Sequence, residues 1–291
     1  MKLGVGVSPT TSIVASQTAA VISAGGGGAS PTIESIRESR VFAWFSTIST
    51  TSQTIANQES SPADGSSQTT YDVQNGSSTG SDSRDATYEA QSGGEYYKQV
   101  TSSSNDYLTM QGFKTTTAFT NSLHKDDAQF TLEIGYGKPA SATTAGYIVS
   151  TAEDSNDTGI SIQQYSSEKM NFLLHRGTPG DFGGDYLSSS ALPDGFQHIL
   201  IVINEGVTNG SAFYINNTKT DTFTITYNSP STGNATYNWT WLASLLDGNT
   251  SNPRFGLHQN AGVGFFAAYN KAVSAAEAAI LYTNAPARFK N

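Results

Sequence analysis

Short segments in which apolar and polar residues alternate with a period of two dominate the second half of this 291-residue chain. Such alternation places one set of side chains on each face of a β-strand, so it constrains the fold more than any other feature. Two nearly continuous apolar runs, 170–174 and 198–203, predict central strands covered on both faces. Frequent Gly, Asn and Pro residues between the segments predict turns. The remaining expected strands are 130–136, 159–163, 212–216, 221–227 and 262–269, with a hairpin loop over 217–220.

One segment near the end of the chain has the pattern of a helix. Ser274 and Glu277 form a capping box, in which the Ser side chain accepts from a backbone N–H and the Glu side chain reaches back. Helix-forming residues follow, and Asn284 and Pro286 end the segment. Many strands and one short C-terminal helix predict an all-β, antiparallel two-sheet sandwich.

Residues 1–35 differ from the rest of the chain. They contain the run Gly25–Gly28, Pro9 and Pro31, many other small residues and only short apolar patches. A segment of this kind cannot build a core of its own. We therefore expect an extended N-terminal arm over 1–35 that anchors the protein, followed by one domain over 36–291. A flexible tail is the alternative for the arm.

Composition excludes several classes of function. The chain has 15 Lys and Arg against 24 Asp and Glu, a net charge of −9, which argues against a nucleic-acid partner. It has no cysteine, so disulfides and zinc–thiolate sites are excluded. No apolar run approaches the ~18 residues of a membrane span. Polar residues 8–12 interrupt the apolar stretch that a secretory signal would need.

Candidate catalytic residues do not form a convincing set. Gly76–Gly80 matches the hydrolase pattern G-x-S-x-G, but no apolar strand precedes it and no helix follows. Glycosidases need two carboxylates that face one cleft. Glu133 is the single acidic residue of its expected strand, and Glu59, Glu89 and Glu95 lie in a Ser/Thr-rich region. We therefore expect no catalytic residues and no enzymatic activity.

Metal ligands are also sparse. The four histidines, His124, His175, His198 and His258, lie far apart without metal-binding spacing, which favours structural or surface roles. Asp154, Asn156 and Asp157 precede Gly159 in a loop that resembles the start of a calcium site, although later ligand positions are Thr158 and Tyr165. An ordinary turn is the alternative. Asp181 and Asp185 indicate a second acidic loop. Calcium is the one cofactor left open.

Trp239 and Trp241 alternate along the segment 237–242 and therefore lie on one face of an expected strand. Two exposed indoles on one face would form a platform on which a sugar can stack. A strand that buries both rings on its inner face is the favoured alternative.

Five segments share a pattern of strands and a closing helix in the same order along the chain: 41–45, 102–109, 196–203, 212–217 and 266–282. They resemble the laminin-G/concanavalin-A-like jelly-roll domains of bacterial and phage surface proteins. The similarity covers roughly 36–291, with Phe196 at a position where the family usually has Trp and Asn217 where it has Gly. It implies two curved antiparallel sheets whose first and last strands are neighbours. Lectins, adhesion modules, hydrolases and structural virion proteins share this sandwich, so the resemblance alone does not give a function.

These features predict a non-enzymatic bacteriophage virion protein on the particle surface. In this interpretation it is a capsid decoration or cement protein that the arm fastens to the major capsid protein or other virion subunits, as an oligomer in the assembly. The alternative is a carbohydrate-binding adhesion module, a tail appendage or receptor-binding, lectin-like protein that recognises a host surface glycan.

Overall fold

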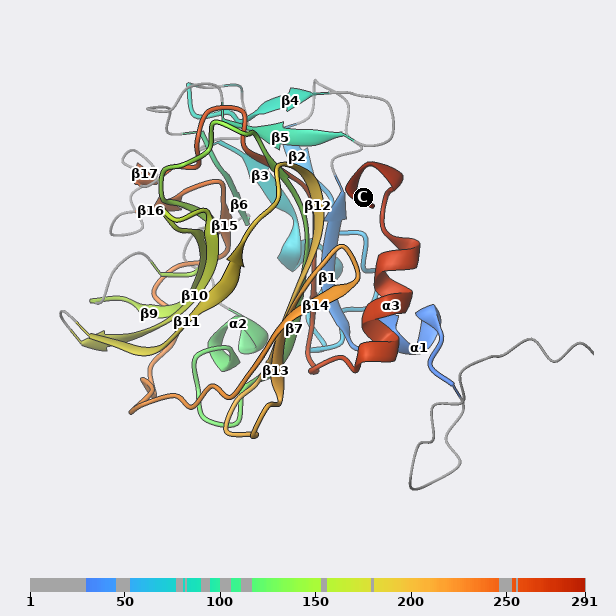
Figure 1. Cartoon of the computed structure of the whole chain (residues 1–291), viewed down its shortest axis with the longest axis vertical. Helices are drawn as coiled ribbons and strands as arrows, with labels where there is room; N and C mark the ends of the chain where they lie inside the picture. The colour runs from blue at the N-terminus through green and yellow to red at the C-terminus, as the bar shows by residue number, and fades with distance from the viewer. Residues whose placement is uncertain are drawn as a thin grey trace, which may run out of the picture. The chain divides into compact units, whose positions relative to one another are not determined.

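The computed structural model describes residues 30–45, 53–76, 81, 83–89, 95–99, 106–110, 117–152, 156–178, 181–245, 253–254 and 256–290. Residues 31–291 form one compact unit. It is an all-β jelly-roll sandwich of two antiparallel sheets of eight strands each, which confirms the predicted fold class (Figure 1).

Strand β18 (Gly262–Tyr269) lies in the middle of the first sheet, which we call sheet A. It pairs with β7 (Gln129–Lys138) on one side, and with β1 (Arg40–Phe45) and β5 (Tyr96–Lys98) on the other. The pairing of β1 with β18 confirms that the first and last strands are neighbours. Sheet A is completed by β12 (Gly195–Asn204), β13 (Ser211–Ile215), β14 (Thr218–Phe223) and β4 (Thr87–Glu89).

The second sheet, sheet B, runs from the long edge strand β11 (Asp181–Ala191) to the short strand β2 (Thr54–Ile55). Between them lie β10 (Lys169–Thr178), β9 (Thr158–Gln164), β8 (Gly146–Ser150), β15 (Thr240–Trp241), β6 (Leu108–Met110) and β3 (Val73–Asn75). A separate two-stranded ladder pairs β16 (Ser244–Leu245) with β17 (Pro253–Arg254).

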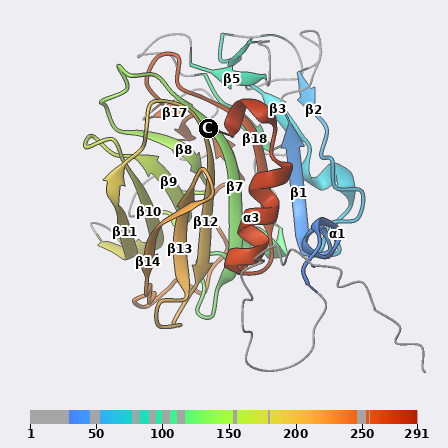
Figure 2. The same ribbon diagram turned by 45° about the vertical axis from the view of Figure 1, so that its right-hand side comes forward.

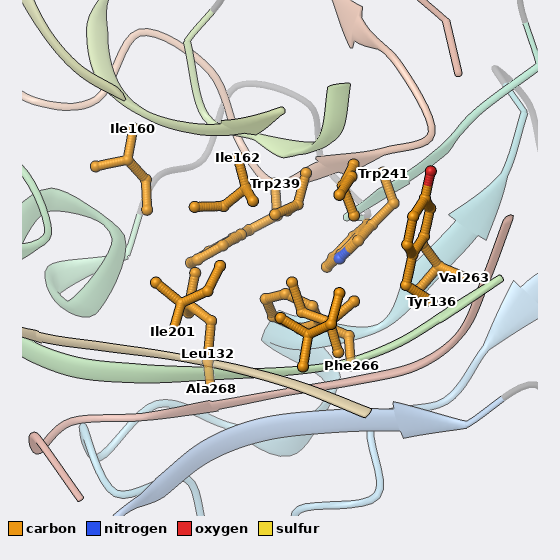
Figure 3. Close-up of a cluster of buried hydrophobic side chains, with 14 of the residues drawn as sticks. Leu132, Tyr136, Ile160, Ile162, Ile201, Trp239, Trp241, Val263, Phe266 and Ala268 are labelled. Carbon is orange, nitrogen blue, oxygen red and sulfur yellow. The ribbon is translucent and has the colours of Figure 1, made fainter. Parts of the chain in front are cut away.

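Aromatic side chains fill the space between the sheets (Figure 3). The indoles of Trp239 and Trp241 are fully buried and stack at 6.3 Å. Phe266 of β18 packs against both indoles, at 5.4 and 5.3 Å, and Phe42 of β1 contacts the same pair. Apolar side chains that point inward from neighbouring strands complete this core, including Leu132, Ile160, Ile162 and Ile201.

The outer face of sheet A is covered by helix α3 (Ala275–Asn284) and by the short helix α1 (Ile33–Arg37) (Figures 1 and 2). Leu200 and Val202 of β12 point toward this layer and pack with Leu281 of α3. This second apolar layer explains why β12 is an almost continuous apolar run. None of the helices that the structure describes is long and apolar enough to cross a bilayer.

The predicted C-terminal helix is confirmed. The Ser274 Oγ accepts from the Glu277 N–H at 3.3 Å, while Glu277 Oε2 accepts from the Ser274 N–H at 2.8 Å. Helix α3 ends at Asn284, before Pro286. Two five-residue helices, α1 and α2 (Ala118–Ser122), were not expected.

Several boundaries differ from the expected ones. The turn between β13 and β14 is Asn216–Asn217 rather than a loop over 217–220, because both Asn residues adopt the positive φ, 49° and 64°, that a tight two-residue hairpin requires. Asp181 and Asp185 belong to strand β11 and not to an acidic loop. The compact unit begins at Pro31 instead of residue 36, since Thr32 caps α1 and Ile36 is buried.

Replacing Trp239 should test the aromatic core. Its indole is fully buried and donates to Thr120 Oγ1 at 2.9 Å, so Trp239→Ala should lower the free energy of unfolding by about 3–5 kcal/mol. Urea unfolding followed by fluorescence or circular dichroism measures the change. Leu187→Ala, at a side chain that is 39% exposed, is the control and should change it by less than about 0.5 kcal/mol. Equal effects of the two substitutions would contradict this assignment of the core.

Candidate functional site

Four glycines leave part of the outer face of sheet A without side chains. Gly135 and Gly137 lie on β7, and Gly262 and Gly264 lie on the neighbouring β18, with Gly262 directly opposite Gly137. A Cβ atom at any of these positions would lie within 2.8 Å of an aromatic ring atom, and at Gly262 it would also meet the Tyr97 carbonyl oxygen of β5. We call these four residues the glycine floor. It allows other groups to lie directly on the backbone of the sheet.

Aromatic rings from separate parts of the chain occupy the glycine floor. The Phe196 ring lies over Gly137, the Phe265 ring over Gly135 and the Phe289 ring over Gly264. Phe196 makes edge contacts with Phe289 at 5.4 Å and with Tyr96 at 5.2 Å. The rings form a continuous aromatic layer beyond the region covered by α3.

A groove of about 350 Å³ opens beside this layer and is our candidate functional site. This volume is at the lower end of the range for small-ligand pockets, roughly 300–1,000 Å³. Its walls combine aromatic, cationic and amide side chains with exposed backbone. The lining residues are Tyr96, Gly137, Lys138, Pro139, Ala140, Gly195, Phe196, Asn260 and Arg288.

The guanidinium of Arg288 lies over the aromatic wall. Its Cζ is 3.6 Å from the centre of the Phe196 ring and 4.7 Å from that of Tyr96, close enough for cation–π attraction. Glu89 Oε1 lies 4.0 Å from Arg288 Nη2, and the other oxygen of Glu89 contacts Lys98. Burial lowers the pKa of Arg288, which as an arginine still remains charged at neutral pH. Burial, helped by Glu89, raises the pKa of Tyr96 to about 12, so its hydroxyl stays protonated.

Lys138 supplies the second cation of the groove. Its side chain is fully buried, and its Nζ lies 2.6 Å from Glu168 Oε2 and 2.5 Å from Asp194 Oδ1. Burial acts to lower the pKa of Lys138, but the hydrogen bonds that its ammonium donates to Asp194 and Glu168, together with their negative charges, outweigh burial, so the pKa is raised. The ion pairs join the end of β7 to the loop before β12 and to the turn between β9 and β10. They hold the groove's wall in one place.

The prediction that Trp239 and Trp241 form a sugar-stacking platform is wrong. Both indoles point into the core between the sheets and have no exposed surface (Figure 3). A sugar cannot reach either ring. The alternative given by the sequence, an inner-face strand that buries both side chains, describes their position.

The candidate calcium loop is described only in part. Asp154 lies outside the described residues, while Asn156 is exposed and Asp157 is buried. The backbone carbonyl of Asp157 accepts from the Gly177 N–H at 2.7 Å, which ties the loop to the end of β10. Among the described His, Asp and Glu side chains, no group of three or more is placed to hold a metal ion. Calcium binding stays a prediction.

Two histidines interact with neighbouring polar side chains. His198 Nε2 lies 2.9 Å from Glu133 Oε1, and the Tyr269 hydroxyl donates to Glu133 Oε2 at 2.6 Å. All three side chains are buried on the outer face of sheet A, near α3. His175 contacts Ser161 Oγ at 2.8 Å on sheet B. The motif at 76–80 is described only at Gly76.

Sequence reasoning did not find the groove. Phe196 was noted only for its place in a family pattern, and Tyr96 and Arg288 lie in other segments of the chain. A signal was present in Gly135-Tyr-Gly137 and Gly262-Val-Gly264, where glycine repeats with the period of a strand. Glycine is unfavourable within strands, and its presence there often marks a close approach of another group.

No protein-family model and no curated protein sequence matches the chain. Solved structures with a similar fold include botulinum neurotoxin type C, in work on its interaction with two ganglioside molecules (TM-score 0.55, 13% identity, 87% of this chain and 52% of that chain). Another is the binding domain of botulinum neurotoxin DC in complex with rat synaptotagmin II, with a TM-score of 0.54 and 13% identity over 85% of this chain and 52% of that chain. A third is Trypanosoma rangeli sialidase in complex with sialic acid, with a TM-score of 0.53 and 12% identity over 90% of this chain and 35% of that chain.

The chain spans about half the length of these toxin chains and about a third of the sialidase. At 12–13% identity the similarities support the sandwich fold and do not assign an activity. Membership of the laminin-G group and a phage origin stay predictions.

His124 should make the stability of the fold depend on pH. Burial, helped by Lys125, lowers the pKa of His124 from 6.5 to about 4, although a hydrogen bond with the Gly233 carbonyl opposes the shift. Between these pH values the unfolded chain binds more protons than the folded chain, so stability falls as the pH falls. We expect a loss of about 2–3 kcal/mol between pH 7 and pH 4 from this group. Urea unfolding at several pH values in that range measures the free energy of unfolding as a function of pH. This free energy should depend less on pH in His124→Gln than in the wild-type protein, and an unchanged pH dependence would contradict the assignment.

Proposed function

We propose that this protein is a non-catalytic carbohydrate-binding module and that the groove beside Arg288 holds an oligosaccharide. The observation that carries the proposal is the combination, in one groove, of an aromatic wall, a guanidinium and the Asn260 amide. Sugars offer hydroxyl groups that accept and donate hydrogen bonds, and ring C–H groups that pack on flat surfaces. The groove presents partners for both.

The rigidity of the groove also supports binding. Lys138 is held by two carboxylates, and Phe196 is held between the sheet backbone and neighbouring rings. A site whose side chains are already fixed loses less conformational entropy when a ligand binds. The polar groups can therefore select a ligand by geometry.

Glu168 and Asp194 could suggest hydrolysis instead, because glycosidases use two carboxyl groups. Both carboxylates contact the ammonium of Lys138. Both are therefore engaged in ion pairs, and neither is among the residues that line the groove. We therefore assign these residues to the support of the wall.

Two similar structures add context to this proposal. Cell entry of one of these proteins is reported to depend on interaction with two ganglioside molecules, and the other was solved in complex with sialic acid. Their sequences are too distant to transfer a site. Chains that contain a sandwich of this shape thus occur in proteins that interact with glycans, and this supports the proposal at the level of the fold.

Attachment to a phage particle through residues 1–35 is a separate proposal. Residues 1–29 lie outside the described residues, and the described compact unit begins at Pro31. A decoration role rests on the composition of this arm and on the family resemblance. A tail-borne glycan-binding protein would combine the arm and the groove in one chain.

Binding to an array of acidic and neutral oligosaccharides tests the groove. We expect binding by the wild-type protein and at least about a tenfold loss of affinity, equivalent to 1.4 kcal/mol, in Arg288→Ala. Arg37→Ala removes a guanidinium that is exposed on α1, outside the groove, and should leave affinity unchanged. The absence of binding by the folded wild-type protein, or equal losses in the two variants, would refute the proposal.

Removing residues 1–30 tests the arm independently. Because the described compact unit starts at Pro31, the truncated chain should fold and keep its affinity for oligosaccharides. A decoration protein would lose attachment to particles after this truncation, which sedimentation with purified particles measures. Retained attachment would contradict the anchoring role of the arm.

A further inference from the structure

We propose that Phe289 is the positioning residue of the groove: its ring, seated on Gly264, fixes the backbone that carries Arg288 over Phe196. This inference rests on the proposed function, because it assigns the placement of a group in the same binding site. Phe289 does not line the groove, but in this proposal it determines where the guanidinium of the lining residue Arg288 lies.

Phe289 is anchored in the aromatic layer. Its side chain is almost fully buried and makes edge contacts with Phe265 at 5.3 Å and Phe196 at 5.4 Å. A Cβ atom on Gly264 would lie 2.2 Å from Phe289 Cζ, so the ring needs a residue without a side chain beneath it. Gly264 is the extra residue of a bulge in β18, because Val263 and Phe265 on either side of it pair with consecutive residues of β7.

The anchor and the guanidinium are neighbours in one short turn. Residues Ala287–Phe289 form a single 3-10 turn, in which the Phe289 N–H donates to the Pro286 carbonyl at 3.0 Å. Phe289 enters the aromatic layer, while Arg288 extends along the wall to Phe196 and Tyr96. Since a three-residue turn has little stability of its own, the buried Phe289 ring supplies the restraint on its backbone.

Phe196 connects the two side chains. Its face carries the Arg288 guanidinium at 3.6 Å, and its ring meets the Phe289 ring edge to face. Loss of Phe289 therefore removes one support of Phe196 and the restraint on Arg288 together. Because Phe289 is not a lining residue, its replacement leaves the side chain of every residue that lines the groove unchanged.

Two variants test this proposal from opposite sides of the contact. Phe289→Ala removes the ring, and Gly264→Ala keeps the ring but places a methyl group where its edge lies. Gly233→Ala is the matched control, since the nearest atom to an added Cβ there is Ser231 Oγ at 3.3 Å. Gly264→Ala also brings its Cβ to 2.6 Å from the Glu95 carbonyl oxygen, so Phe289→Ala decides the outcome if the glycine variant does not fold.

The first measurement needs no ligand. In the wild-type protein the Nε–H resonance of Arg288 should be displaced by the ring current of Phe196, and in Phe289→Ala it should move to the position of a solvent-exposed arginine. Arg288→Ala assigns the resonance by its disappearance. An Arg288 resonance that stays displaced in folded Phe289→Ala would overturn the proposal.

The second measurement is the affinity for the oligosaccharide that binds best on the array. Phe289→Ala should weaken binding by about tenfold or more, and should cause a much smaller loss when added to Arg288→Ala, where only the support of Phe196 is left to lose. Equal losses in both backgrounds would overturn the positioning role. If the wild-type protein binds no oligosaccharide, the proposed function fails, while the resonance of Arg288 still decides whether Phe289 positions it.

Discussion

The packing of strand β18 on both of its faces is the constraint on which the rest of the structure depends. Its inner face contributes Phe266 to the cluster that contains Trp239 and Trp241, and this contact holds the two sheets together. Its outer face contributes Gly262 and Gly264 to the glycine floor. The bulge at Gly264 separates the two roles, since Val263 points inward and Phe265 points outward on either side of it. One strand thus links the stability of the core to the shape of the groove.

The outer face of sheet A is divided between two kinds of cover. Helix α3 buries Leu200 and Val202, while the aromatic layer covers the glycine floor. The polar group of Glu133, His198 and Tyr269 lies where these covers meet, and its hydrogen bonds satisfy both oxygens of the buried carboxylate. A sheet face in contact with solvent would need neither an apolar cover nor hydrogen bonds from neighbouring side chains to the Glu133 carboxylate. The groove is therefore formed by a layered face, in which rings replace the helix at one end of the sheet.

Local sequence patterns predicted the parts of the fold that depend on local chemistry. Alternation identified β7, β9 and β18, and the capping box of Ser274 and Glu277 located α3, because each pattern is read within a few neighbouring residues. Strand β11 was missed because Gly183 and Gly184, flanked by acidic residues, have the composition of a loop. Its strand conformation comes from pairing with β10, which no local pattern reports. The groove was missed for the same reason, since Tyr96, Phe196 and Arg288 meet only through the tertiary fold.

The position of β18 in sheet A has a consequence for biosynthesis. It is the last strand that the structure describes along the chain, yet it lies between β7 and β1 in the middle of the sheet. While the ribosome makes the preceding residues, β1 and β7 lack their shared partner and leave unpaired edges. Such edges invite pairing with other nascent chains. Sheet A can close only after residues 262–269 have emerged, so completion of this sandwich is a late step that depends on inserting its central strand.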